Sequence, residues 1–227
     1  MKRSQHHRRK TLGQLPMAAG LAVLAGLLAQ TPGAQAQPKP IPGGYLFSFN
    51  KNISTETPPP TPPAGDGPWL SAAVTDNGTG GVYIDLTGAL NSPLEFISSV
   101  GFNLAKQVSP KNGALDSSLW SCTAAPIDSI NCGASSIEQQ FDALPKINMA
   151  NGAQGFDLAI NLPISNKDKT GRFQLGDTAR FSIAGLSPDD FRETNDPGSP
   201  ITGLYTAAKV QGIGPKGEGS ATIGDPP

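Results

Sequence analysis

The sequence predicts an all-β fold, an antiparallel β-sandwich of about seven or eight strands with very little helix. Two observations lead to this fold class. Short segments along the chain alternate apolar and polar residues, as strands do when one face of a sheet is buried. Clusters of Gly, Pro, Asn and Asp separate these segments, and such residues favour turns. We expect the strands to form a single domain over residues 45–224.

The first 36 residues have the features of a cleavable signal peptide. Five basic residues are followed by an apolar segment at residues 17–28, and Ala34-Gln35-Ala36 then supplies the small residues that signal peptidase accepts. A membrane anchor is the alternative, but a spanning helix needs about 20 apolar residues, more than this segment has. Arg8-Arg9 leaves the twin-arginine route open beside the general one. We therefore expect an exported protein that is periplasmic, extracellular or at the cell surface.

Removal of this leader changes the composition on which function depends. The remaining 191 residues hold 12 basic and all 18 acidic residues, which gives a formal charge of −6 instead of −1. An acidic domain without a basic cluster in its sequence is a poor partner for nucleic acid or an anionic membrane. No second apolar segment approaches spanning length, so we expect no membrane span in the mature chain.

The positions of the two histidines exclude histidine-based catalysis and metal binding from the mature chain. Both histidines, His6 and His7, lie in the leader, so the mature chain has no imidazole. This removes Ser-His-Asp triads, Cys-His pairs and histidine-ligated metals. No other catalytic motif is recognisable, and we therefore predict no catalytic residue, no metal ligand and no cofactor, in a protein that is not an enzyme.

Two cysteines remain after cleavage, Cys122 and Cys132. In an exported protein such a pair predicts a disulfide, and a loop of about ten residues would give it a stabilising effect of roughly 2.5–3 kcal/mol. A redox pair and a thiolate metal site are the alternatives. The spacing is not C-x-x-C, and no other thiol or imidazole is present to complete a zinc site.

The elements follow one another closely along the mature chain. A Pro-rich lead-in at residues 37–44 is expected to be flexible, and the first strand begins at Tyr45. Residues 51–68 hold six prolines and are expected to form an exposed loop, with a polyproline docking segment as the alternative. Residues 76–81, DNGTGG, predict a turn between two strands. Helix is expected only at residues 135–144, for one or two turns, and in a capped turn at residues 187–191.

The later strands are recognised by apolar residues at alternate positions, which should face the core. These core-facing sets are Tyr45, Phe47 and Phe49; Val82, Ile84 and Leu86; Phe96, Val100, Phe102 and Leu104; Phe156, Leu158, Ile160 and Leu162; Ala179, Phe181 and Ile183; and Leu204, Thr206, Ala208 and Val210.

The candidate ligand-binding residues lie around the first hairpin. Tyr83 has the outward parity of its strand, so its ring is available to stack on a sugar. Asp76 and Asp85 are carboxylates of the kind that bind calcium in oxygen-rich turns. The simpler interpretation is structural, because Asp and Asn are common turn formers and a single aromatic residue is not a binding platform. Two carboxylates suffice for a glycosidase, but nothing in the sequence selects a pair.

Several segments resemble those of bacterial secreted proteins of the PEP-CTERM sorting type. They are GPWLSAAVTD (67–76), LEFISSVGFNL (94–104), GFDLAINLP (155–163), GRFQLGDTARFSIAGLSPDDF (171–191) and YTAAKVQGIG (205–214). The last segment is the most specific, and the others occur in the family's order and spacing. The resemblance implies an exported β-sandwich that is retained at the cell surface or released from it.

The function that this resemblance implies is not enzymatic. It suggests an envelope or extracellular-matrix protein, with envelope polysaccharide or other matrix proteins as partners, and a carbohydrate- or calcium-dependent binding module as the alternative. The family's sorting tail is Pro-Glu-Pro, then an apolar helix, then a basic cluster. Residues 224–227, GDPP, match none of it, so we expect a periplasmic or secreted protein.

Overall fold

The computed structural model describes residues 38–54, 61–105, 113–114, 120–125, 135–139, 155–164, 171–194 and 203–225. All of them belong to one compact unit of the chain, Gln35–Pro227. The predicted signal peptide and its cleavage site lie outside the described residues. Within the described part, no helix has the length and apolarity needed to cross a membrane.

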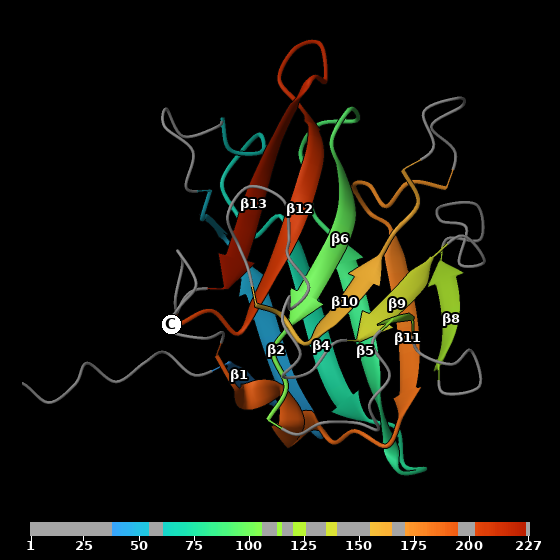
Figure 1. The fold of residues 1–227 in the computed structure, drawn as a ribbon. Coiled ribbons are helices and arrows are strands. Elements are labelled where there is room, and N and C mark those ends of the chain that lie inside the picture. The colour runs from blue at the N-terminus through green and yellow to red at the C-terminus, as the bar shows by residue number, and fades with distance from the viewer. Residues whose placement is uncertain are drawn as a thin grey trace, which may run out of the picture. The chain divides into compact units, whose positions relative to one another are not determined.

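Two antiparallel sheets form the fold. The six-stranded sheet has the order β1-β2-β4-β5-β11-β8. Its strands are β1 (Lys39–Ile41), β2 (Gly44–Phe49), β4 (Leu70–Asp76), β5 (Gly81–Gly88), β11 (Thr178–Ala184) and β8 (Trp120–Ala125). In Figure 1, β2, β4 and β5 lie behind the strands of the other sheet.

The seven-stranded sheet has the order β3-β13-β12-β6-β10-β9-β7. Its strands are β3 (Lys51–Asn52), β13 (Gly219–Asp225), β12 (Thr206–Ile213), β6 (Phe96–Phe102), β10 (Leu158–Asn161), β9 (Ser136–Gln139) and β7 (Gly113–Ala114). The hairpin of β12 and β13 projects beyond the neighbouring strands at the top of Figure 1. The predicted all-β sandwich is therefore confirmed, with more strands than expected because both sheets are extended by short ones.

The core lies between the two sheets. Phe47 of β2 and Phe102 of β6 are fully buried and meet edge to face, with ring centroids 6.0 Å apart. Phe191 of the segment after β11 also meets Phe102 edge to face, with ring centroids 5.5 Å apart. These rings join residues of both sheets into one cluster, and burying their apolar surface is the main favourable contribution to folding.

The expected core position of Phe96 is wrong, because β6 contains a bulge. Lys209 of β12 pairs with Ser99, but the next residue, Val210, pairs with Ile97, so Ser98 is an extra residue in β6. One extra residue reverses which side chains face the core. Ile97 therefore joins the core cluster, and Phe96 faces the outside of the seven-stranded sheet.

Phe156 also differs from the expected alternation. It lies two residues before β10, and its ring packs on Gly101 at the outer face of β6. There it forms a second apolar cluster with Ile53, Leu204 and Ala207. The outer face of the seven-stranded sheet is thus partly covered by its own small core.

The helix expectations had different outcomes. Residues 188–192 form the short 3-10 helix η3 (Pro188–Arg192), with the Asp190 carboxylate accepting hydrogen bonds from the Ser187 backbone N–H and hydroxyl. The expected helix at residues 135–144 is wrong where the structure describes it. Ser136–Gln139 is strand β9, because pairing with β10 satisfies its backbone in a way that a weak local helix preference cannot match.

The lead-in at residues 37–44 and the two ends of the Pro-rich segment at residues 51–68 are attached to the sandwich. The lead-in forms β1, which pairs with β2. Ile53 is buried, and the backbone N–H of Ala64 donates to the Glu95 carboxylate at 2.9 Å. The indole N–H of Trp69 donates to the Ala64 carbonyl at 3.1 Å, so the end of this segment is held against the core.

Candidate functional site

Two of the predicted site residues, Tyr83 and Asp85, lie together on the outer face of the six-stranded sheet. Both come from β5, and Arg180 of β11 stands directly opposite Asp85. The guanidinium donates to both carboxylate oxygens of Asp85, at 2.6 and 2.9 Å. It also lies over the Tyr83 ring, 4.5 Å from the ring centroid. The hydrogen bonds to Asp85 raise the pKa of Arg180, so its guanidinium stays charged at any physiological pH.

The third predicted residue, Asp76, is not part of this group. It pairs with Val82, a core residue, and therefore has the opposite parity to Tyr83 and Asp85. Its carboxylate accepts a hydrogen bond from the Gly78 backbone N–H, as in an Asx turn. The Asn77 side-chain oxygen accepts from the Thr79 and Gly81 backbone N–H groups in the same turn. The structure thus gives Asp76 the turn-forming part that its position in the sequence favours.

A shallow pocket of about 530 Å³ adjoins the Asp85–Arg180 pair. Its lining also includes the threonines Thr87, Thr123 and Thr178, together with Leu86 and Ala179. Their hydroxyl groups come from three adjacent strands, β5, β8 and β11. Such a surface can hydrogen-bond a polar ligand, although Tyr83 is covered on one face by Arg180.

A second tyrosine is arranged like Tyr83. The Tyr45 hydroxyl donates to the Asp189 carboxylate at 2.7 Å, and Arg192 lies 5.3 Å from the Tyr45 ring centroid. Arg192 also contacts Asp189 at 3.7 Å. The hydrogen bond to Asp189 is the main cause of the raised pKa of Tyr45. Each tyrosine on this sheet is therefore accompanied by an Arg and an Asp that bind each other.

Other carboxylates are also used as structural acceptors. Asp157 accepts from the Leu104 backbone N–H at 2.9 Å, and Asp177 from the Gln174 N–H at 2.7 Å. Glu95 and Asp225 accept single backbone N–H groups, but burial raises the pKa of both. One carboxylate oxygen of Glu95 is buried and has no hydrogen-bond partner. Burial therefore disfavours the charged form of these two groups.

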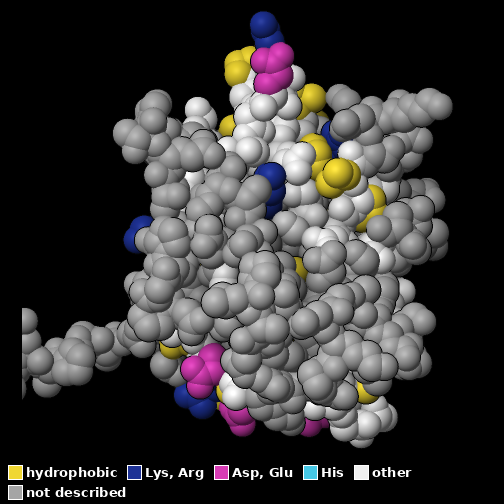
Figure 2. Space-filling view, in the orientation of Figure 1, with side chains coloured by type: hydrophobic (Ala, Val, Ile, Leu, Met, Phe, Trp, Pro, Cys, Tyr) yellow, Lys and Arg dark blue, Asp and Glu magenta, His cyan; other side chains and the backbone are white. Residues whose placement is uncertain are grey.

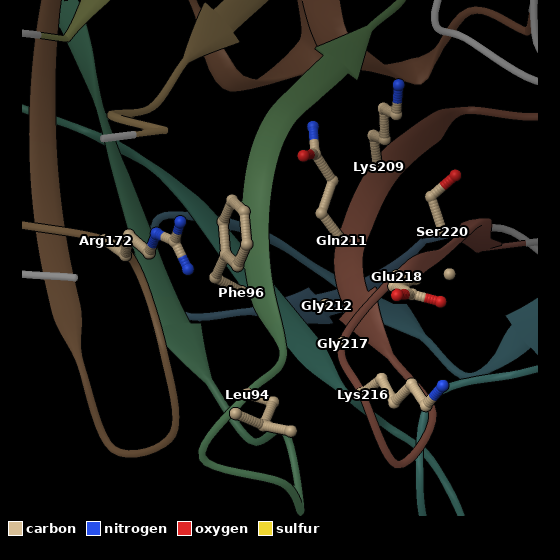
Figure 3. Close-up of a pocket in the computed structure, with 11 residues that line it drawn as sticks. Leu94, Phe96, Arg172, Lys209, Gln211, Gly212, Lys216, Gly217, Glu218 and Ser220 are labelled. Atoms are coloured by element: carbon tan, nitrogen blue, oxygen red, sulfur yellow. The ribbon is translucent and has the colours of Figure 1, made fainter. Parts of the chain in front are cut away.

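A pocket on the other sheet was not foreseen from the sequence. It has a volume of about 430 Å³ and lies on the outer face of the seven-stranded sheet, beside the β12–β13 hairpin. Its side chains include Phe96, Arg172, Lys209, Gln211, Lys216 and Glu218 (Figure 3). We call it the β12 pocket. It brings together residues that are far apart in the chain, so no local sequence motif predicts it.

The bulge in β6 builds one wall of the β12 pocket. Phe96, turned outward, stands directly opposite Gln211 of β12. The Arg172 guanidinium lies over the Phe96 ring, 4.1 Å from its centroid, and this leaves only 4% of Phe96 exposed. Arg172 is itself 7% exposed. Figure 3 shows the ring of Phe96 between Arg172 and Gln211.

A second irregularity shapes the floor of the pocket at Gly212. The pairing of β12 with β13 shifts between Gln211 and Ile213, and Gly212 has a φ of +81°. A Cβ atom at this position would lie 1.9 Å from the Leu94 carbonyl oxygen. Only glycine fits here, because the backbone is left-handed and the turn before β6 approaches it closely.

Charge distinguishes the β12 pocket from the rest of the described surface. It collects three of the seven described cations, Arg172, Lys209 and Lys216, with one carboxylate, Glu218. In Figure 2, dark-blue basic side chains lie at the tip of the projecting hairpin and below it, with one acidic group beside the tip, and further basic side chains lie at the left edge and, next to acidic ones, at the lower end. A basic patch attracts anionic ligands.

No metal site is found in the described part of the chain, where no three His, Cys, Asp or Glu residues are grouped so that they could hold an ion. Cys122 lies in β8 opposite Phe181 and packs against the core. Cys132 lies outside the described residues, so the bridge between them stays a prediction.

Comparisons with known proteins found no matching family model, no similar curated protein and no similar solved structure. The resemblance to PEP-CTERM-type proteins therefore rests on the sequence segments alone.

Proposed function

We propose that this chain is an exported, non-enzymatic protein of the bacterial envelope or extracellular matrix. The use of its carboxylates as structural acceptors is the observation that carries the proposal. Asp85 is bound by Arg180, Asp76 shapes a turn, Asp189 is held by Tyr45, and Asp190 caps η3. With no histidine after the leader, carboxylates are the usual acid–base groups that remain. Their engagement in local structure supports a scaffold rather than a hydrolase.

The experiment measures in which cell fraction the protein is found. The full chain is expressed in the bacterium that produces it, and the cytoplasmic, periplasmic, surface and medium fractions are compared. We expect the protein in the exported fractions, with Gln37 as its first residue. Retention of the uncleaved chain in the cytoplasm would contradict the proposal.

A second measurement separates a scaffold from an enzyme. The exported protein is incubated with the cell's own envelope polysaccharide, and new reducing ends are measured. We expect no release above the background. Turnover that falls by orders of magnitude in Asp85→Asn or another single carboxylate variant would overturn the non-enzymatic part of the proposal.

A polysaccharide-binding module is the second candidate, favoured by the threonine-lined pocket beside Asp85 and Arg180. Saturable binding of envelope polysaccharide that disappears in Tyr83→Ala would support this site. Binding that requires calcium would point to Asp85 at this site, and it would need Arg180 to release Asp85 first.

A further inference from the structure

We propose that the β12 pocket binds an acidic saccharide, a segment of a uronate-containing polysaccharide, with Lys209 and Lys216 as the partners of the carboxylates of neighbouring uronate units. The inference rests on the proposed function, because it names the ligand class of an envelope protein. It concerns the seven-stranded sheet, and Tyr83, Asp76 and Asp85 have no part in it.

The charges of the pocket select an anion. Among the described residues, neither Lys209 nor Lys216 forms an ion pair, in contrast to Arg180 and Arg192. Lys216 is exposed on the turn of the β12–β13 hairpin, and Lys209 is half-buried on the outer face of β12. An ammonium group at a partly enclosed surface binds a carboxylate more strongly than one in open water, since the local dielectric constant is lower.

The position of Arg172 adds a fixed positive charge. Its guanidinium is held against Phe96 and is nearly buried, so it loses little conformational freedom when a ligand arrives. It is placed to contribute electrostatic potential, whereas the two lysines are placed to reach the ligand.

The remaining lining favours a sugar over a simple inorganic anion. The Gln211 amide and the Ser220 hydroxyl stand opposite each other on β12 and β13. Gly217 and Gly219 leave the backbone accessible beside them. Amide, hydroxyl and backbone groups are the partners that sugar hydroxyls need. A volume of about 430 Å³ is also within the usual range for a small organic ligand.

A long, densely charged polymer fits less well. Double-stranded DNA carries one charge per about 1.7 Å and needs an extended basic surface. The basic groups here occupy one pocket, and the mature chain carries a formal charge of −6. A uronate polymer has one charge per sugar, which suits a site with two lysines.

The test measures binding of the exported protein to three short acidic saccharides: oligogalacturonate, an alginate oligomer and a hyaluronan oligomer. Isothermal titration calorimetry is carried out at low and at physiological salt. We expect at least one to bind saturably, with an affinity that falls as salt rises. The methyl ester of the oligogalacturonate, which has the same sugars without the charge, should bind about tenfold or more weakly than the free acid.

The variant K209Q/K216Q should weaken binding of the acid by about tenfold or more, and K209R/K216R should restore most of it. K39Q/K51Q is the matched control, because it removes the same charge from lysines that do not line the pocket. Its affinity should stay within about twofold of that of the unmodified protein. Thermal melting curves of all variants check that the fold is kept.

The inference would be overturned by no binding of any of the three saccharides, by equal binding of the acid and the ester, or by a loss of affinity in K39Q/K51Q equal to that in K209Q/K216Q. If millimolar inorganic phosphate displaces the saccharide, and the saccharide binds no more tightly than phosphate does, the pocket is a phosphate site instead. If the protein is exported and binds a neutral envelope polysaccharide independently of Lys209 and Lys216, the proposed function stands and this inference fails.

Discussion

On the outer face of the six-stranded sheet, Arg180 is bound by both carboxylate oxygens of Asp85 and covers Tyr83. On the outer face of the seven-stranded sheet, Lys209 and Lys216 border a pocket without an ion-pair partner among the described residues. In the first arrangement the charged groups are paired within the protein. In the second the two lysines are left to pair with a ligand. A residue type that suggests binding is therefore informative only when its neighbours across the strands are known.

The seven-stranded sheet also differs in having its outer face partly covered. Phe156 is fully buried there, against Gly101. Phe156→Ala should lower the free energy of unfolding by about 3–5 kcal/mol, because a large ring leaves a cavity behind. Tyr83→Ala on the other sheet should cost about 1 kcal/mol or less, since that ring is half-buried. Urea unfolding curves measure both, and similar losses would show that the two faces are not covered differently.

The next largest effect should come from Gly212, on which the shape of the β12 pocket depends. Gly212→Ala places a methyl group against the Leu94 carbonyl and forces a side chain into left-handed backbone, at a cost of about 3 kcal/mol. Gly214→Ala is the control, because its φ is +87° but no atom lies within 4 Å of the added Cβ. It should cost only about 1 kcal/mol. Equal costs in denaturation would mean that the close approach of Leu94 does not constrain the pocket.

A smaller effect should depend on pH through Glu95. Burial raises the pKa of this carboxyl in the folded state, so the folded protein binds the proton more tightly than the unfolded chain. The contribution of Glu95 to the free energy of unfolding should therefore increase as pH falls through the pKa of the folded state toward the pKa of the unfolded chain. It should decrease again as pH rises. Glu95→Gln should remove this contribution.

The measurement for Glu95 is the difference in melting temperature between the two proteins from pH 7 to pH 4. The unmodified protein should gain relative to Glu95→Gln as pH falls. Asp225, whose pKa is also raised by burial, remains in both proteins and cancels in the difference. A difference that does not change with pH would show that Glu95 is not held in a desolvated site.

The smallest effect should come from the Asp85–Arg180 pair itself. Its side chains are 32% and 54% exposed, so solvent screens their attraction. A double-mutant cycle with Asp85→Ala and Arg180→Ala should give a coupling energy of about 0.5 kcal/mol, decreasing with salt. A coupling above about 2 kcal/mol would mean that the pair is a principal support of its sheet.

Much of the architecture could be predicted because local residue patterns indicate strands, turns and caps. The alternation of Val82, Ile84 and Leu86 places these residues in the core, and Ser187 and Asp190 cap a short helix as expected. The turn at Asp76 could be recognised from its Asn and Gly residues. In the turn and the cap the deciding hydrogen bonds join residues close in sequence, and within one strand alternation alone decides which side chains share a face.

The candidate site depended on contacts between distant residues. The partner of Asp85 is Arg180, 95 positions away, and no sequence pattern links the two. The alternation places Phe96 on the wrong face, because the bulge at Ser98 is created by pairing with β12, more than a hundred residues later.

The sequence by itself determined the all-β class, most core positions, the turns and the excess of acidic over basic residues after residue 36. The tertiary structure alone decided which charges are neutralised and where a basic pocket forms. The physical reason is that alternation specifies only which of two faces a side chain takes. Strand order, register and bulges decide its neighbours on that face, and they arise from the packing of the whole domain.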